Sequence, residues 1–131
     1  MKHYKPYQGL GVLVTGHTGF KGSWLSLWLQ DLGANIKGYS LSPNTDNSLF
    51  IEGKVGDHME SQIGDIRDLS SLKKSINKFK PDILVHLAAQ PLVRESYINP
   101  VETYSTNIMG TVNVLEALIK SIFHTLGISI Q

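Results

Sequence analysis

The sequence predicts an α/β protein with a doubly wound parallel sheet, that is, a sheet with helices on both faces. Short apolar runs alternate with segments of helical periodicity along the 131 residues. The clearest run, 82–89, is almost continuously apolar, as in a strand covered on both faces. Evenly spaced glycines follow the first apolar run, where a strand would turn into a helix. Together these observations predict the order βαβ-βαβα.

The first half of the chain divides into clear elements. Residues 11–15 fit a buried strand, and 20–32 fit a helix, in which Trp24 and Trp28 lie one turn apart, as do Leu25 and Leu29. Gly33 is a natural end for this helix. A second strand is expected at 35–41. The segment 42–57 is rich in Ser, Pro, Asn and Gly, which predicts a loop with room for one helical turn at 47–52.

The second half continues the alternation. A third strand is expected within 58–66 and a helix over 68–79, with Leu69, Leu72 and Ile76 facing inward and its lysines forming a solvated face. The strand 82–89 and a long helix over 101–122 follow. In sheets of this kind ligands bind at the carboxyl ends of the strands, so segments 15–22, 40–46 and 88–96 are the candidate binding region.

The composition argues against several classes of protein. The net charge is +1 with scattered basic residues, which does not suit nucleic-acid binding. The absence of cysteine excludes disulfides and thiolate metal sites, and we predict no metal site. No apolar run is long enough to span a bilayer and no signal segment is visible. We therefore expect a cytoplasmic protein without a membrane partner.

The stretch GVLVTGHTGFKG places Gly16, Gly19 and Gly22 three residues apart. Gly16 gives the freedom for a sharp turn, Gly19 lets a phosphate approach the backbone, and Gly22 permits close packing at a cost of about 1 kcal/mol relative to alanine. The helix that starts here presents unpaired N–H groups. This combination predicts a pyrophosphate site, although turn glycines alone would show the same spacing.

The residues expected around the pyrophosphate are Gly16, Thr18, Gly19 and Phe20, mostly through backbone N–H groups. Lys21 and His17 could add charge near the phosphates or the adenine ribose, with an exposed helix lysine as the alternative for Lys21. No Asp or Glu ends the second strand, so the residues leave NAD and NADP open, with Ser40 as a plausible ribose contact.

The glycine loop TGHTGFKG resembles that of the extended short-chain dehydrogenase/reductase family, as do GDIRD (64–68), HLAAQ (86–90) and the segment 99–117. The stretch AAQPLVR resembles the branch of that family that acts on CDP-glucose. The resemblance covers about 7–118. It implies that 1–118 form the N-terminal part of an NAD(P)-binding Rossmann-like domain, without the substrate domain. The tail 119–131 is then either the cut-short start of the next strand or foreign sequence from a reading-frame change.

The resemblance also implies further site residues. Asp65 would meet the adenine while Ile66 packs against its ring, unless Asp65 only caps its loop. Leu87, Ala88, Ala89 and Gln90 would line the cofactor, together with Thr106 in the long helix; Asn107 would link that helix to the sheet. His86 fits a core histidine better than an acid or base. Arg94 and Ser96 would meet a sugar nucleotide or, equally, lie in an exposed loop.

The family catalyses with a Tyr and a Lys four residues later, and no tyrosine of this chain has that partner, so we predict no catalytic residue. The resemblance implies NAD as cofactor and the N-terminal part of an enzyme that converts CDP-glucose to CDP-4-keto-6-deoxyglucose for O-antigen synthesis, inactive alone. A non-catalytic nucleotide-binding module and part of another NAD(P)-dependent sugar-nucleotide epimerase or reductase are the alternatives. The 101–122 helix could form a homodimer. An incomplete sheet should also expose an apolar edge.

Overall fold

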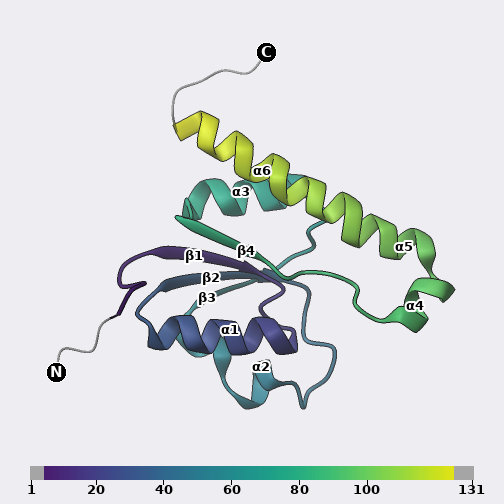
Figure 1. The fold of residues 1–131 in the computed structure, drawn as a ribbon, viewed down its shortest axis with the longest axis horizontal. Helices are drawn as coiled ribbons and strands as arrows, with labels where there is room; N and C mark the ends of the chain where they lie inside the picture. The colour runs from purple at the N-terminus through teal and green to yellow at the C-terminus, as the bar shows by residue number, and fades with distance from the viewer. Residues whose placement is uncertain (1–4, 126–131) are drawn as a thin grey trace.

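A computed structural model describes residues 5–125 and shows a four-stranded parallel sheet in the order β3-β2-β1-β4 (Figure 1). The strands are β1 (Gly11–Thr15), β2 (Asn35–Ser40), β3 (Glu60–Ile63) and β4 (Ile83–His86). Strand β4 is shorter than the predicted 82–89, because the chain turns away from the sheet after His86. The predicted α/β class with a parallel sheet is confirmed.

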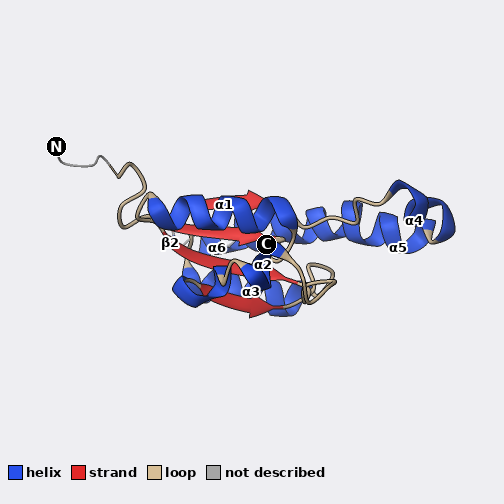
Figure 2. Cartoon of the chain, turned by 90° about the horizontal axis from the view of Figure 1, so that it is seen from below, coloured by secondary structure: helices blue, strands red, loops and turns tan. Residues whose placement is uncertain are grey.

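The helices lie in two layers. Helices α1 (Phe20–Asp31) and α2 (Leu49–Glu52) cover one face of the sheet, and α3 (Leu69–Phe79) and α6 (Gly110–Thr125) cover the other (Figure 1). Helices α4 (Val93–Ile98) and α5 (Pro100–Tyr104) extend beyond the sheet (Figure 2). The expected long helix consists of α5, the π-helical turn η2 (Ser105–Met109) and α6, and a 3₁₀ turn, η1 (Val55–His58), precedes β3.

The strands are in register at their carboxyl ends. Thr15, the last residue of β1, pairs with Tyr39 of β2 on one side and His86 of β4 on the other. The loops that leave β1, β2 and β4 therefore start from one edge, as the ligand-binding prediction requires. None of the described helices is long and apolar enough to cross a membrane.

Each face of the sheet has its own core, because residues alternate between the faces along β1. Val12 and Val14 pack with Leu29 of α1, whereas Leu13 packs with residues of α3 and α6. The core on the face covered by α3 and α6 consists of Leu13, Tyr39, Ile66, Leu72, Ile76, Val114 and Ala117. The inward positions predicted for α3 are confirmed at Leu72 and Ile76, which are fully buried.

Helix α1 buries small residues rather than its tryptophans. Gly22, Ser23 and Ser26 lie against the sheet, while Trp24 and Trp28 are 56% and 65% exposed. The four-residue spacing of the tryptophans indicated the helix correctly, but they lie on its outer side, and Leu29 is the large residue that α1 buries against the sheet.

The chain exposes the apolar edge that was expected. Strand β4 is an edge strand, and all four of its residues are only half-buried. Four apolar residues of α6 are about half exposed: Val112, Leu115, Ile119 and Ile122. Helix α6 continues to Thr125, so the first part of the predicted atypical tail is helical, and 126–131 lie outside the described residues.

Candidate dinucleotide-binding site

The turn after β1 is built on Gly16, whose φ is +79°. Its amide donates to the carbonyl of Tyr39 at 3.0 Å. A Cβ at this position would lie 2.7 Å from the backbone nitrogen of Ala88, so the loop after β4 passes directly over it. The predicted sharp turn is confirmed, and it places the loops after β1 and β4 in contact.

Helix α1 begins without a side-chain cap. Its N-cap, Gly19, has no side-chain hydrogen bond, and the first α-helical bond runs from the Ser23 amide to the Gly19 carbonyl at 2.8 Å. The amides of the first turn, at Phe20, Lys21 and Gly22, precede that bond and have no acceptor four residues back within the helix. The start of α1 thus offers N–H groups and the positive end of the helix dipole to an anion.

Gly19 and Gly22 differ in the space around them. A Cβ on Gly22 would overlap the carbonyl oxygen of Gly16, so this position admits no side chain. A Cβ on Gly19 would meet only that same oxygen, at 3.4 Å, and its φ of −75° suits any residue. The close packing predicted at Gly22 is confirmed, with the loop rather than the strand as the neighbour. Nothing in the fold itself requires glycine at 19.

Thr18 and Ser40 lie together between the glycine loop and the end of β2. Their hydroxyl oxygens are 2.8 Å apart, and the Thr18 hydroxyl also donates to the Leu41 carbonyl. Both side chains are almost fully buried. This bond ties the loop after β1 to the loop after β2. Phe20, by contrast, is 71% exposed, and Lys21 is exposed on the first turn of α1.

His17 is fully buried. Its Nε2 lies 2.7 Å from the Ser61 hydroxyl, its ring packs edge-on against Phe50, and a Cβ on Gly38 would overlap the imidazole. Burial lowers the pKa of His17 to about 4. The expectation that His17 adds charge near the phosphates is therefore wrong at neutral pH, because the ring is neutral and enclosed between β2, β3 and α2.

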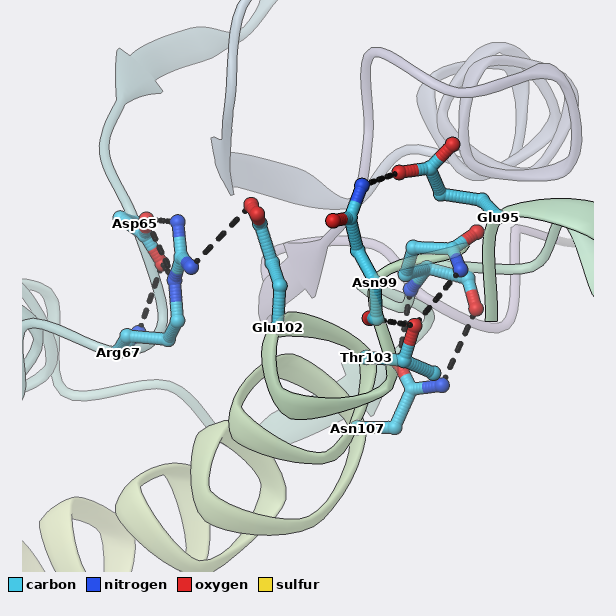
Figure 3. A network of polar contacts seen from close by, with 8 residues as sticks. Asp65, Arg67, Glu95, Asn99, Glu102, Thr103 and Asn107 are labelled. Atoms are coloured by element: carbon cyan, nitrogen blue, oxygen red, sulfur yellow. Dashed lines mark hydrogen bonds and ion pairs between the residues drawn. The ribbon is translucent and has the colours of Figure 1, made fainter. Parts of the chain in front are cut away.

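Asp65 and Arg67 form a local ion pair in the loop after β3 (Figure 3). The Arg67 amide donates to Asp65 Oδ1 at 2.9 Å, and the guanidinium Nη2 donates to Oδ2 at 2.6 Å. Arg67 lowers the pKa of Asp65 through these bonds. Asp65 therefore does cap its loop, while its side chain stays 29% exposed.

The side chain of Ile66 does not face the solvent edge. It is 4% exposed and lies in the core, where a Cβ on Gly110 would come within 2.7 Å of its Cγ1. Asn113 of α6 donates to the carbonyl oxygen of Ile66 at 3.0 Å and to that of Arg67 at 3.2 Å. Packing of the Ile66 side chain on an adenine ring is thus not supported, because that side chain packs against α6.

The segment after β4 is held from both sides. Thr15 Oγ1 accepts from the amides of Leu87 and Ala88 at 3.1 and 3.2 Å. The same oxygen is 2.6 Å from Nδ1 of His86, whose Nε2 is 3.0 Å from the Thr111 hydroxyl. Both nitrogens of His86 have partners, which confirms the predicted satisfied histidine, although the residue is half-buried on an edge strand rather than in the core. Leu87 and Ala89 are exposed, and Ala88 is half-buried.

Gln90 joins this segment to the long helix. Its amide donates to Asn107 Oδ1 at 2.7 Å, and Asn107 Nδ2 donates to its carbonyl at 3.1 Å (Figure 3). Its side-chain amide donates to the Thr103 hydroxyl at 3.1 Å. Asn107 is thus the expected polar link. Thr106 is half-buried in η2 beside it.

Arg94 and Ser96 lie in α4, not in the loop that the sequence suggested. Ser96 donates to the Val93 carbonyl at 2.6 Å, which is a bond within its own helix. Arg94 is exposed. No group of His, Asp and Glu among residues 5–125 is arranged to hold a metal ion.

The sequence reasoning missed Arg67, Thr111 and Asn113 as organising residues. Arg67 was visible as the arginine of GDIRD, two residues after the candidate adenine-binding Asp65, where a bidentate pair can form. Thr111 and Asn113 gave no local signal, because their partners lie in other elements.

Comparison with known proteins identifies the family. Residues 13–126 match the family model described as GDP-mannose 4,6 dehydratase. The chain is 62% identical over 112 residues to CDP-glucose 4,6-dehydratase of Salmonella typhimurium, which covers 86% of this chain and 31% of that protein. The chain therefore spans about a third of the length of this relative.

Two solved structures share the fold. UDP-glucose 4-epimerase of Brucella ovis, solved in complex with NAD, is 28% identical with a TM-score of 0.74, over 87% of this chain and 33% of the epimerase. The enzyme of Stenotrophomonas maltophila, with bound NAD and formylated UDP-arabinopyranose, is 26% identical with a TM-score of 0.74, over 92% of this chain and 35% of that one. The chain belongs to the GDP-mannose 4,6-dehydratase family, within the extended short-chain dehydrogenases/reductases.

Proposed function

We propose that this chain forms the NAD-binding part of a CDP-glucose 4,6-dehydratase. The 62% identity to the Salmonella enzyme supports the choice of CDP-glucose among the substrates of related enzymes. The main structural observation in its support is the uncapped start of α1 after the Gly16 turn, at the edge where β1, β2 and β4 end. This geometry suits a pyrophosphate bridge between two nucleotides.

The residues present fit a dinucleotide at Gly19. The fold leaves this position free for a side chain, yet the chain keeps glycine, which is what a phosphate close to the backbone requires. The amides at Phe20 and Lys21 would hold the pyrophosphate, with Gly16 shaping the turn and Lys21 adding charge. When bound, NAD supplies the hydride acceptor for oxidation of the sugar.

The adenosine half of NAD would lie toward β2 and β3. There Ser40, supported by Thr18, would meet the ribose, and Asp65 would accept from the adenine amino group. Ile66 contributes by fixing this loop in the core, and His17 by holding the glycine loop on Gly38. The segment 41–48 after β2 has no basic side chain to offset a 2′-phosphate, which favours NAD over NADP.

The other half of the dinucleotide would run along the segment after β4. Leu87, Ala88 and Ala89 would line it, while Gln90 holds the segment to Asn107 and Thr106 lies alongside. Arg94 and Ser96 would lie near the sugar nucleotide, because α4, which carries them, follows the segment that lines the cofactor.

The proposed parent reaction removes water from CDP-glucose to give CDP-4-keto-6-deoxyglucose, a precursor for O-antigen sugars. The 131 residues contain no Tyr with a Lys four positions later, so we propose that this chain binds the cofactor without turnover. The exposed apolar residues of α5 and α6 would serve a homodimer, and the cysteine-free composition suits the cytoplasm.

Calorimetric titration with NAD, NADP and ADP, together with a dehydratase assay on CDP-glucose, tests this proposal. We expect NAD and ADP to bind, NADP to bind more weakly, and no product to form. Gly19→Ala should abolish binding without unfolding, because the methyl group fits the fold but occupies the phosphate position.

Gly11→Ala is the matched control, since Gly11 lies at the other end of β1 and a Cβ there makes only ordinary contacts. Unchanged NAD affinity in Gly19→Ala would contradict the pyrophosphate site. Product formation by the purified chain would contradict the proposal that this chain binds the cofactor without turnover.

A further inference from the structure

Arg67 contacts both oxygens of the Asp65 carboxylate. Its amide donates to Oδ1 at 2.9 Å, and its Nε lies 3.0 Å from Oδ1 and 2.9 Å from Oδ2. Its Nη2 completes the fork, at 2.6 Å from Oδ2. A planar guanidinium in this bidentate arrangement fixes the plane of the carboxylate as well as its position.

The fork limits what else the carboxylate can accept. A carboxylate offers about four lone-pair directions. Arg67 brings three N–H groups to the carboxylate: its amide donates to Oδ1, Nη2 donates to Oδ2, and the single Nε–H lies within reach of both oxygens. About one of the four directions therefore remains for a further donor, and the Asp65 side chain is 29% exposed.

The backbone below the carboxylate is fixed independently. The carbonyl oxygen of Asp65 accepts from the Tyr39 hydroxyl at 3.2 Å, and the amide of Gly64 donates to the Ser40 carbonyl at 2.8 Å. Asn113 holds the following two carbonyls. The loop is therefore rigid on its inner side, so the orientation of the carboxylate depends on Arg67 alone.

The far side of Arg67 reaches the long helix. Its Nη1 lies 3.5 Å from Oε1 of Glu102 in α5, and the guanidinium lies between the two carboxylates in Figure 3. The contact is longer than those to Asp65, and the Glu102 side chain is 63% exposed. Glu102 steadies the guanidinium but does not orient the Asp65 carboxylate.

We propose that Arg67 is a positioning residue for adenine recognition, which presents the Asp65 carboxylate with a single open acceptor direction. This inference rests on the proposed NAD site. An N–H group in that direction donates a hydrogen bond to the carboxylate. A carbonyl oxygen there makes no hydrogen bond, because a deprotonated carboxylate cannot donate. Adenine has an amino group at this position and hypoxanthine has a carbonyl, so the arrangement distinguishes the two bases.

The test compares dissociation constants for NAD and for nicotinamide hypoxanthine dinucleotide in the full 131-residue chain. We expect the unmodified chain to prefer NAD about tenfold or more, as for a hydrogen bond to a charged group. Arg67→Gln and Arg67→Lys, which lose the fork, should reduce the preference to about threefold or less. Glu102→Gln, the control, should leave it unchanged.

The outcomes separate this inference from the proposed function. If the unmodified chain binds neither dinucleotide, the proposed NAD site fails and this inference fails with it. If it binds NAD but the Arg67 variants weaken both dinucleotides equally, Arg67 is only structural and this inference alone is overturned. An equal loss of preference in Glu102→Gln would also overturn it, because the effect would then come from α5.

Discussion

The imidazole of His17 occupies the space above Gly38, where a Cβ would overlap its ring. His17, from the loop after β1, therefore packs on a glycine of β2, and its ring also contacts Phe50 and the hydroxyl of Ser61. This fit holds the glycine loop against β2.

Gly38→Ala should destabilise the fold by about 2 kcal/mol, because the methyl group and the imidazole compete for one space. His17→Ala alone opens a cavity, and adding Gly38→Ala should partly fill it. Urea unfolding followed by circular dichroism would measure the cycle. Additive effects of the two substitutions would show that the residues do not share this space.

Stability should fall as the pH drops from about 6.5 to 4. Burial lowers the pKa of His17 to about 4, so the unfolded chain binds more protons than the folded one in this window. The full difference corresponds to about 3 kcal/mol. Burial also lowers the pKa of His86, which acts in the same direction.

The measurement is the free energy of unfolding between pH 4.5 and 7.5, for the unmodified chain and for His17→Asn. The variant should show a flatter dependence on pH. His58→Asn removes an exposed histidine and serves as the control. An identical slope in all three proteins would contradict the buried neutral state of His17.

His86 should be neutral with its proton on Nε2. The Thr111 hydroxyl donates to the Asn107 carbonyl at 2.7 Å, so its oxygen must accept from His86 Nε2. Nδ1 then accepts from the Thr15 hydroxyl. Nitrogen-15 NMR of the histidine rings at pH 7 would report this tautomer directly, and a proton on Nδ1 would reverse the assigned direction of the chain of hydrogen bonds.

Gly22→Ala should behave differently from Gly19→Ala. A methyl group at 22 overlaps the Gly16 carbonyl, so we expect a loss of about 3 kcal/mol in stability as well as loss of NAD binding. Thermal unfolding by circular dichroism would separate the two variants. A Gly22→Ala protein as stable as the unmodified chain would show that the loop can move away from α1.

The chain should associate through the exposed apolar residues of α6. Leu115 is 53% exposed on that helix, and Leu115→Glu should shift the sedimentation coefficient toward the monomer. Lys120→Gln changes the net charge by the same amount at an exposed position and is the matched control. A monomeric unmodified chain with sharp, reversible unfolding would contradict this prediction.

The strands, the glycine turn and most helices could be predicted because their signals are local. Gly16 and Gly33 both have the positive φ that their positions suggested, and the apolar periods of β1 and α3 matched their buried faces. A short apolar run or a glycine after a helix has the same meaning in most α/β proteins.

The environments of single side chains could not be predicted, because they depend on partners distant in sequence. The role of His17 depends on Gly38 and Ser61, which lie on other strands. The short helix α4 follows a proline and has no strong period. It is held by bonds of Gln90 to Leu92 and Thr103, which no local pattern reveals.

The position of the tryptophans has a practical consequence for spectroscopy. The sequence has two, Trp24 and Trp28, and both lie on the outer surface of α1, away from the two cores. Their emission should already resemble that of indole in water in the folded chain and change little on unfolding. A blue shift would instead report that another surface has covered α1, which gives this chain a built-in optical probe for association on that face.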